Sequence, residues 1–130
     1  MKILHLLSQI ELTGAEVYAI TLAEWQKNAG HKVLLVSDEL HRKTNVPFLP
    51  LAVHRTNAWT RFSSKKWLKT YITNHKIDVV HAHSRAAVRL AHSCCRQTSC
   101  ALVTTLHGKP HRSWSKKIFD IYGDKVISIC

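Results

Sequence analysis

Five short apolar runs alternate along this chain with segments whose apolar residues recur at helical spacing. The runs cover residues 3–7, 33–36, 79–81, 102–106 and 126–129. Each run is nearly continuous rather than alternating with polar residues, which is typical of strands buried on both faces of a parallel sheet. Strands that are joined through helices make right-handed crossovers. The alternation therefore predicts an α/β fold with a doubly wound, mainly parallel, Rossmann-like sheet.

The first helical segment follows the first strand-like run after a short polar loop. Its apolar stripe is expected to hold Tyr18, Leu22, Trp25 and Ala29. We expect the helix to stop at Gly30, because glycine commonly follows the last turn of a helix.

Three further helices are expected along the chain. The second opens at Ser63 and Ser64 and the third opens near Ser84. The second is expected to bury Trp67, Leu68, Tyr71, Ile72 and His75. The third is expected to bury Ala87, Val88, Leu90, Ala91 and either Cys94 or Cys95. The fourth is expected from Ser113 to Gly123, whereas residues 45–51 contain two prolines and fit at best a short edge strand.

The length of 130 residues corresponds to about one domain, so we expect residues 1–130 to form a single Rossmann-like unit. The chain ends directly after its last strand-like run, so we expect the domain to be cut short at its C-terminal end. Its first residues show no small-residue cleavage site and are too few to span a bilayer, which favours a cytoplasmic protein. The four cysteines form no C-x-x-C pair, and we expect free thiols.

The net charge of +11 is unevenly distributed along the chain. Residues 1–39 carry three basic and five acidic side chains, whereas residues 40–130 carry sixteen basic and three acidic ones. Such asymmetry points to an anionic partner, which could be nucleic acid, anionic lipid or a phosphorylated substrate. A well-solvated basic surface without a partner would have the same composition.

Polar residues follow the strand-like runs at the positions where ligands bind in open α/β sheets, outside the carboxyl ends of the strands. The third run is followed by His83 and Ser84, and the fourth by His107 and Gly108. We expect His81 to be buried in the sheet and His83 to face the crevice. The pair shares one face of a strand, but its spacing implies no third ligand, so no metal is expected.

The loop after the first strand contains a single glycine, Gly14. A dinucleotide-binding loop would need three glycines and a P-loop would need a G-K-[ST] ending, and both are absent. The remaining functional interpretation is a helix N-terminus whose free N–H groups receive an anion. A plain tight turn explains the stretch equally well.

Four blocks in order resemble the N-terminal half of family 4 retaining glycosyltransferases, which have the GT-B architecture of two Rossmann-like domains. The blocks are "MKILHLLSQIELTGAEVYAITLAEWQKNAGHKVLLVS", "IDVVHAHSRAAVRLA", "LVTTLHG" and "DKVISIC". The resemblance implies that the loop with Thr13 and Gly14 approaches the phosphates of a nucleotide-sugar donor. Thr13 stands where the family usually has a glycine. It further implies that His107 is catalytic and that His83, Ser84 and Gly108 line the acceptor cleft.

The same resemblance implies hexosyl transfer with retention and without a metal or other cofactor, with the nucleotide sugar as co-substrate. The acceptor would be an envelope glycan or a lipid-linked sugar. The donor would be held mostly by a C-terminal domain that these 130 residues do not contain. The chain alone is therefore expected to be inactive.

Basic and aromatic side chains are interleaved across residues 55–69. They are Arg55, Trp59, Arg61, Phe62, Lys65, Lys66 and Lys69. On an amphipathic helix this mixture suits an anionic membrane surface, and we expect a peripheral location at the inner face of the cytoplasmic membrane. Nucleic acid would fit the same pattern but is less compatible with the resemblance. The alternative function is a non-catalytic basic α/β module that binds nucleic acid or anionic lipid.

Overall fold

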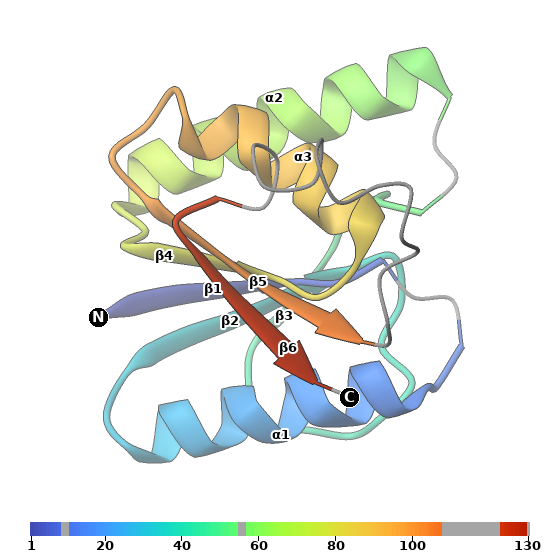
Figure 1. Ribbon diagram of the computed structural model, residues 1–130, viewed down its shortest axis with the longest axis vertical. Coiled ribbons are helices and arrows are strands. Elements are labelled where there is room, and N and C mark those ends of the chain that lie inside the picture. Colours follow the sequence, from blue (N-terminus) through green and yellow to red (C-terminus); the bar gives the residue numbers. More distant parts are fainter. Residues whose placement is uncertain (9–10, 55–56, 108–122, 130) are drawn as a thin grey trace.

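A computed structural model describes residues 1–8, 11–54, 57–107 and 123–129 of the chain. Six strands form one sheet with the order β3-β2-β1-β4-β5-β6, and all five neighbouring pairs are parallel (Figure 1). The strands are β1 (Lys2–Leu6), β2 (Lys32–Ser37), β3 (Phe48–Pro50), β4 (Val79–Ala82), β5 (Ala101–His107) and β6 (Lys125–Ile129). The predicted doubly wound parallel sheet is confirmed, and residues 48–50 of the proline-containing segment form the expected short edge strand.

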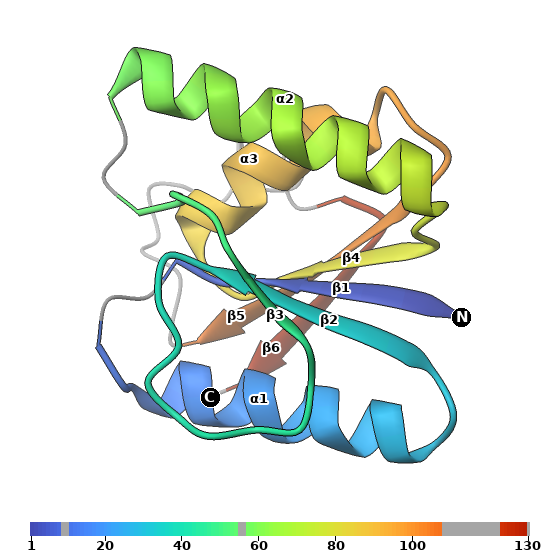
Figure 2. The same ribbon diagram turned by 180° about the vertical axis from the view of Figure 1, so that it is seen from behind.

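The helices cover the two faces of the sheet separately. They are α1 (Gly14–Asn28), α2 (Ala58–His75) and α3 (Arg85–Cys95). In both views α2 and α3 lie together on one face and α1 lies alone on the other (Figures 1 and 2). The chain winds from β1 to the edge strand β3 and then crosses through α2 to β4 on the other side of β1. Strand order therefore reverses between β1 and β4.

Alternate residues of the central strands belong to two separate hydrophobic cores, because successive side chains of a strand point to opposite faces of the sheet. Leu4 and Leu6 of β1 belong to the larger core under α2 and α3. Ile3 and Leu7 belong to the smaller core under α1. His5 lies between Ile3 and Leu7 in this alternation, so its side chain is directed to the α1 face.

Helix α1 buries a different stripe from the one predicted. Its fully buried apolar residues are Ala19, Ile20 and Ala23, whereas Trp25 is 69% exposed. Two alanines four residues apart present little bulk to the sheet, so the helix packs with its small side chains inward. The expectation based on the large apolar residues of this helix was therefore wrong.

Helix α2 begins five residues earlier than predicted. Asn57 caps it, and its side-chain oxygen accepts a hydrogen bond from the Thr60 N–H at 2.8 Å. Ser64 lies inside the helix and its hydroxyl donates to the Ala52 carbonyl at 2.7 Å. Five residues of this helix were expected to be buried. Leu68 and Ile72 are buried, Trp67 and Tyr71 are half-buried, and His75 is exposed.

Helix α3 agrees with its prediction. Ser84 caps it, with its hydroxyl accepting from the Ala87 N–H at 3.1 Å, and both Cys94 and Cys95 are buried free thiols. Most of the expected fourth helix lies outside the described residues. Within the described part of the chain, no helix is both long and apolar enough to cross a membrane.

Candidate functional site

The residues predicted from the strand ends meet at one edge of the sheet. All six strands are parallel, so the carboxyl ends of β1, β4 and β5 lie together, and α1 begins there after β1. The side of the sheet formed by these carboxyl ends is the edge referred to below. This edge carries Gly14 at the start of α1, His83 and Ser84 after β4, and His107 at the end of β5. It lies where strand order reverses, which is the usual ligand position in open α/β sheets.

The N-terminus of α1 is capped but accessible. Thr13 adopts an extended backbone, which suits a β-branched residue, and its side-chain oxygen accepts from the Glu16 N–H at 3.5 Å. Gly14 is exposed, and a Cβ built on it would meet no atom within 4 Å. The fold itself therefore does not require glycine at this position. Its bare backbone leaves room for an anion to approach the first N–H groups of the helix.

Two serines connect the loops that follow β1 and β4. The hydroxyls of Ser8 and Ser84 hydrogen bond at 2.5 Å, and Ser84 caps α3 at the same time. Ser84 is half-buried, so part of its side chain is accessible at the edge of the sheet. This link holds the two central loops at a fixed separation.

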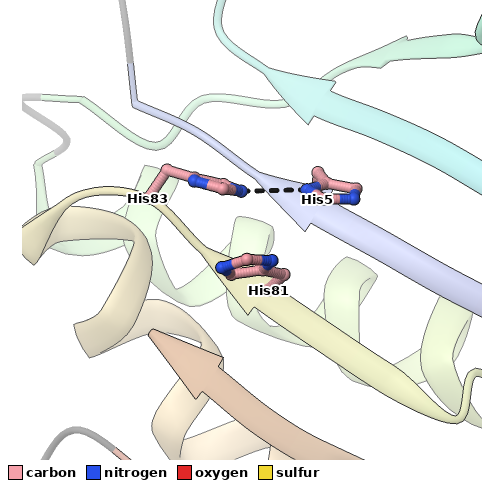
Figure 3. Close-up of side chains that lie close together, drawn as sticks. All are labelled: His5, His81 and His83. Carbon is pink, nitrogen blue, oxygen red and sulfur yellow. Dashed lines mark hydrogen bonds between the residues drawn. The ribbon is translucent and has the colours of Figure 1, made fainter. Parts of the chain in front are cut away.

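Three histidines form a cluster beside β1 and β4 (Figure 3), on the face of the sheet where His5 contacts Gln26 of α1. His5 of β1 lies directly opposite His81 of β4 in the strand register, and His83 follows two residues later. The exposed fractions of His5, His81 and His83 are 0%, 4% and 3%. Their ring centroids are 5.1 Å apart for His5 and His81, 5.2 Å for His5 and His83, and 4.1 Å for His81 and His83.

The hydrogen bonds of the cluster define the tautomers of two rings. His5 Nε2 donates to Gln26 Oε1 at 2.7 Å, so Nδ1 of the neutral His5 ring is an acceptor. His83 Nε2 lies 2.9 Å from His5 Nδ1 and donates to it. The other nitrogen of His83, Nδ1, is then a buried acceptor with no hydrogen-bond partner among the described residues. His81 Nε2 hydrogen bonds to Thr105 Oγ1 at 2.7 Å.

All three rings are neutral near pH 7. Burial lowers the pKa of His5 to about 4, although the hydrogen bond to Gln26 opposes the shift. Burial, with the neighbouring histidines His5 and His107, lowers the pKa of His81 to about 3. Burial and the nearby rings also hold the pKa of His83 well below its ordinary value. A charged imidazolium here would lack both water and a carboxylate partner.

His107 connects the cluster to the surface. It is exposed, and burial of part of its ring lowers its pKa from the ordinary value. Its ring lies 5.5 Å from the ring of Tyr18, and the ring of Tyr18 lies 6.1 Å from that of His83. The expectation that His83 faces the crevice is wrong, because its side chain is buried and Tyr18 lies beside it.

Three residues of this region were not predicted to belong to the site: His5, Gln26 and Tyr18, which was expected only in the apolar stripe of its helix. His5 belongs to an apolar strand and carries no motif of its own. Its position opposite His81 follows only from the pairing of β1 with β4, which the sequence pattern does not specify.

The predicted anion-binding surface is a feature of α2. Trp59 and Phe62 are 83% and 63% exposed and lie one turn apart. Arg61, Lys66 and Lys69 are also exposed, and Lys65 is half-buried. A pocket between α2 and α3 is lined by Arg61 and Arg89 together with Ser64. Arg55 and Gly108 lie outside the described residues.

Comparison with known proteins identifies a family. The sequence profile of Glycosyltransferase Family 4 matches residues 12–128. No curated protein sequence matches the chain significantly.

Solved glycosyltransferase structures share the fold. A glycosyltransferase from Rickettsia africae ESF-5 superposes with a TM-score of 0.75 at 20% identity, covering 98% of this chain and 37% of that one. MurG from Acinetobacter baumannii gives a TM-score of 0.70 at 13% identity, and the match covers 98% of this chain and 41% of MurG. Anabaena Alr3699/HepE in complex with UDP gives a TM-score of 0.64 at 19% identity, and the match covers 82% of this chain and 29% of that one. The chain thus spans about two fifths of the length of the first two.

The neutral histidine cluster predicts acid sensitivity of folding. In the unfolded chain each histidine binds a proton near pH 6.5, whereas folded His5 and His81 do so only near pH 4 and pH 3. The contribution of these rings to the free energy of unfolding is therefore fully present above the pKa of the unfolded chain, and it decreases as the pH falls below about 6.5. Each excluded proton contributes about 1.4 kcal/mol per pH unit to the free energy of unfolding.

Urea unfolding at pH 7, 6 and 5 measures this slope. His75→Gln, a substitution of an exposed histidine at the end of α2, should keep the slope of the parent chain, and His81→Gln should lower it by about one proton. A free energy of unfolding that stays constant between pH 6.5 and pH 5 would contradict the assignment of neutral buried rings.

Proposed function

This chain belongs to Glycosyltransferase Family 4, and from this membership we propose that it forms the acceptor-binding half of a retaining glycosyltransferase. The reaction moves a hexose from a nucleotide sugar to an envelope glycan or a lipid-linked acceptor. The observation that supports this proposal most is the meeting of Gly14, Ser84 and His107 at one edge of the sheet, at the switch between β1 and β4.

The N-terminus of α1 is proposed to receive the diphosphate of the donor. Gly14 and Ala15 are the first two residues of the helix, and their N–H groups have no hydrogen-bond partner within it. The partial positive charge of a helix N-terminus favours an anion, and the missing side chain of Gly14 lets that anion come close. In the transfer reaction these groups would stabilise the charge that develops on the departing nucleoside diphosphate.

His107 is proposed to hold the acceptor. Burial of part of the ring lowers its pKa and so favours the neutral form, in which one ring nitrogen can accept a hydrogen bond from an acceptor hydroxyl. Tyr18 lies beside the ring and restricts its orientation. Ser84 offers a second polar group at the same edge, and together they would position the acceptor hydroxyl for attack. The proposed transfer step itself uses no metal.

Most of the donor site is proposed to lie outside these 130 residues. The chain corresponds to 37% and 41% of the length of the Rickettsia and Acinetobacter proteins, so much of a comparable enzyme has no counterpart here. The description of Alr3699/HepE in complex with UDP supports a nucleotide-sugar donor. The isolated chain is therefore proposed to be inactive and to bind nucleotide sugars only weakly.

We further propose that α2 docks on the inner face of the cytoplasmic membrane. The exposed Trp59 and Phe62 provide apolar surface, and Arg61, Lys66 and Lys69 add exposed positive charge along the same helix. Aromatic side chains combined with basic ones are typical of helices that lie in the interface of an anionic bilayer. A lipid-linked acceptor would then reach the edge of the sheet from the same side.

The role of His107 is tested by sugar transfer with the full product of the reading frame that contains this chain. His107→Ala should lower kcat about 10²–10³-fold, as loss of one positioned polar group in a closed site typically does. Donor affinity should change much less, because the donor is held mainly elsewhere. His75→Ala, at the opposite edge of the sheet, is the matched control. Full turnover by His107→Ala would refute the assigned role.

The docking surface is tested by vesicle sedimentation. The chain should bind vesicles that contain anionic lipid and not neutral ones. Binding should weaken steeply as salt rises, because the screening length shrinks from about 10 Å at 0.1 M to about 3 Å at 1 M. Lys66→Glu combined with Lys69→Glu should abolish it, whereas Lys43→Glu, on the loop after β2, should not. Equal binding to neutral vesicles, or tighter binding to DNA, would contradict the proposal.

A further inference from the structure

We propose that His5, His81 and His83 form a binding site for one divalent transition metal ion of the zinc type. Such a site goes beyond sugar transfer, and it does not depend on the proposed function. Only two ligands could be expected from the spacing of His81 and His83 along the chain. The pairing of β1 with β4 supplies the third, because it places His5 opposite His81.

The three rings have nearly the geometry that zinc requires. One nitrogen from each ring lies within 4.8 Å of one nitrogen from each of the others. With zinc–nitrogen bonds of about 2.0–2.1 Å, tetrahedral coordination places ligand nitrogens about 3.3 Å apart. His5 Nδ1 and His83 Nε2 are already 2.9 Å apart. A pair at the outer limit of 4.8 Å would have to approach by about 1.5 Å to reach the tetrahedral spacing.

In His5 and His81, the ring nitrogen that would not bind the ion is hydrogen bonded to an oxygen, as is usual in metal sites. Histidines that bind metals usually hydrogen bond through the second ring nitrogen to an oxygen, which fixes the ring and its tautomer. His5 Nε2 donates to Gln26 Oε1 at 2.7 Å, which leaves Nδ1 directed at the cluster. His81 Nε2 is bonded to Thr105 Oγ1 at 2.7 Å, which leaves its Nδ1 as the nitrogen for the ion.

The third ring, His83, has to change its tautomer to bind the ion. Its Nδ1 is buried and has no hydrogen-bond partner among the described residues, so no existing hydrogen bond prevents a proton from moving there. On metal binding, the proton of His83 moves from Nε2 to Nδ1, and the Nε2 lone pair then turns to the ion. The total charge of the protein ligands does not change in this step, because all three rings stay neutral.

The chemistry of the ligands selects the kind of ion. Neutral imidazoles suit zinc, copper, nickel and iron, whereas magnesium and calcium prefer oxygen ligands. The cluster offers one ligand nitrogen from each of three rings, and among the described residues no carboxylate belongs to it. Because the rings are buried, the ion would join β1 to β4, with α1 linked only through the hydrogen bond from His5 to Gln26, and it would not contact the sugar acceptor. Three protein ligands leave one position for water.

Zinc binding to the purified chain tests the site after treatment with a chelator. Competition with a chromophoric chelator should show one tight zinc site per chain, and His5→Gln or His83→Gln should remove it. His75→Gln is the matched control and should retain it. Cobalt should give the visible absorption of a nitrogen-coordinated tetrahedral ion without a thiolate charge-transfer band. A thiolate band, or tight binding that survives both cluster substitutions, would overturn the proposal.

A second variant keeps the test valid if the histidine substitutions prevent folding. Gln26→Leu removes only the oxygen that orients His5, and Gln26 is half-buried on α1. Loss of such a supporting group typically lowers metal affinity about 10–100-fold. Gln97→Leu, at an exposed position, should leave the affinity unchanged. Equal zinc affinity for the parent chain and Gln26→Leu, or no tight site in the parent chain, would exclude the proposed site.

Discussion

The parallel pairing of β1 with β4 is the interaction on which the rest of this structure depends. It joins the two halves of the sheet and creates the point where strand order reverses. The same register sets His5 opposite His81 and Leu6 opposite Ala82. Beyond the strand ends it brings Ser8 within 2.5 Å of Ser84. One strand pairing therefore builds the edge proposed to bind the acceptor and the histidine cluster behind it.

The two faces of this central pair have different chemistry. Toward α2 and α3, Leu4, Leu6 and Val80 belong to a continuous apolar core. Toward α1, β1 and β4 carry His5 and His81, and His83 follows β4, where apolar residues would otherwise be buried. Burying imidazoles gains less free energy than burying leucine side chains, and an unpaired nitrogen adds a cost. In return, the hydrogen bonds of His5 to Gln26 and to His83 link α1 to the residue that follows β4.

The fold could largely be predicted from the sequence because apolar runs and turn residues act locally. The strand-like runs at residues 3–7 and 102–106 lie on β1 and β5, and Ser84 caps α3 as predicted. The predictions of burial were wrong where contacts between distant segments determine which side of a helix faces the sheet. Trp25 is exposed because Ala19 and Ala23 let α1 approach the sheet. Gly14 and His107 could be proposed for the site because they follow strands directly, whereas the position of His5 depends on a pairing between residues 76 apart in the chain.

The edge formed by Gly14, Ser84 and His107 is proposed to bind the reacting groups of a sugar transfer. Backbone amide NMR shifts of the isotope-labelled chain test this directly, on addition of UDP-, GDP- and ADP-sugars and, separately, of lipid-linked or free glycan acceptors. We expect an acceptor to shift Ser84 and His107, and one of the nucleotide sugars to shift Gly14 and Ala15 weakly. The amide of His75, at the opposite edge, should not move. Shifts confined to residues away from this edge, or tight binding of a nucleotide sugar by the chain alone, would contradict the proposed site.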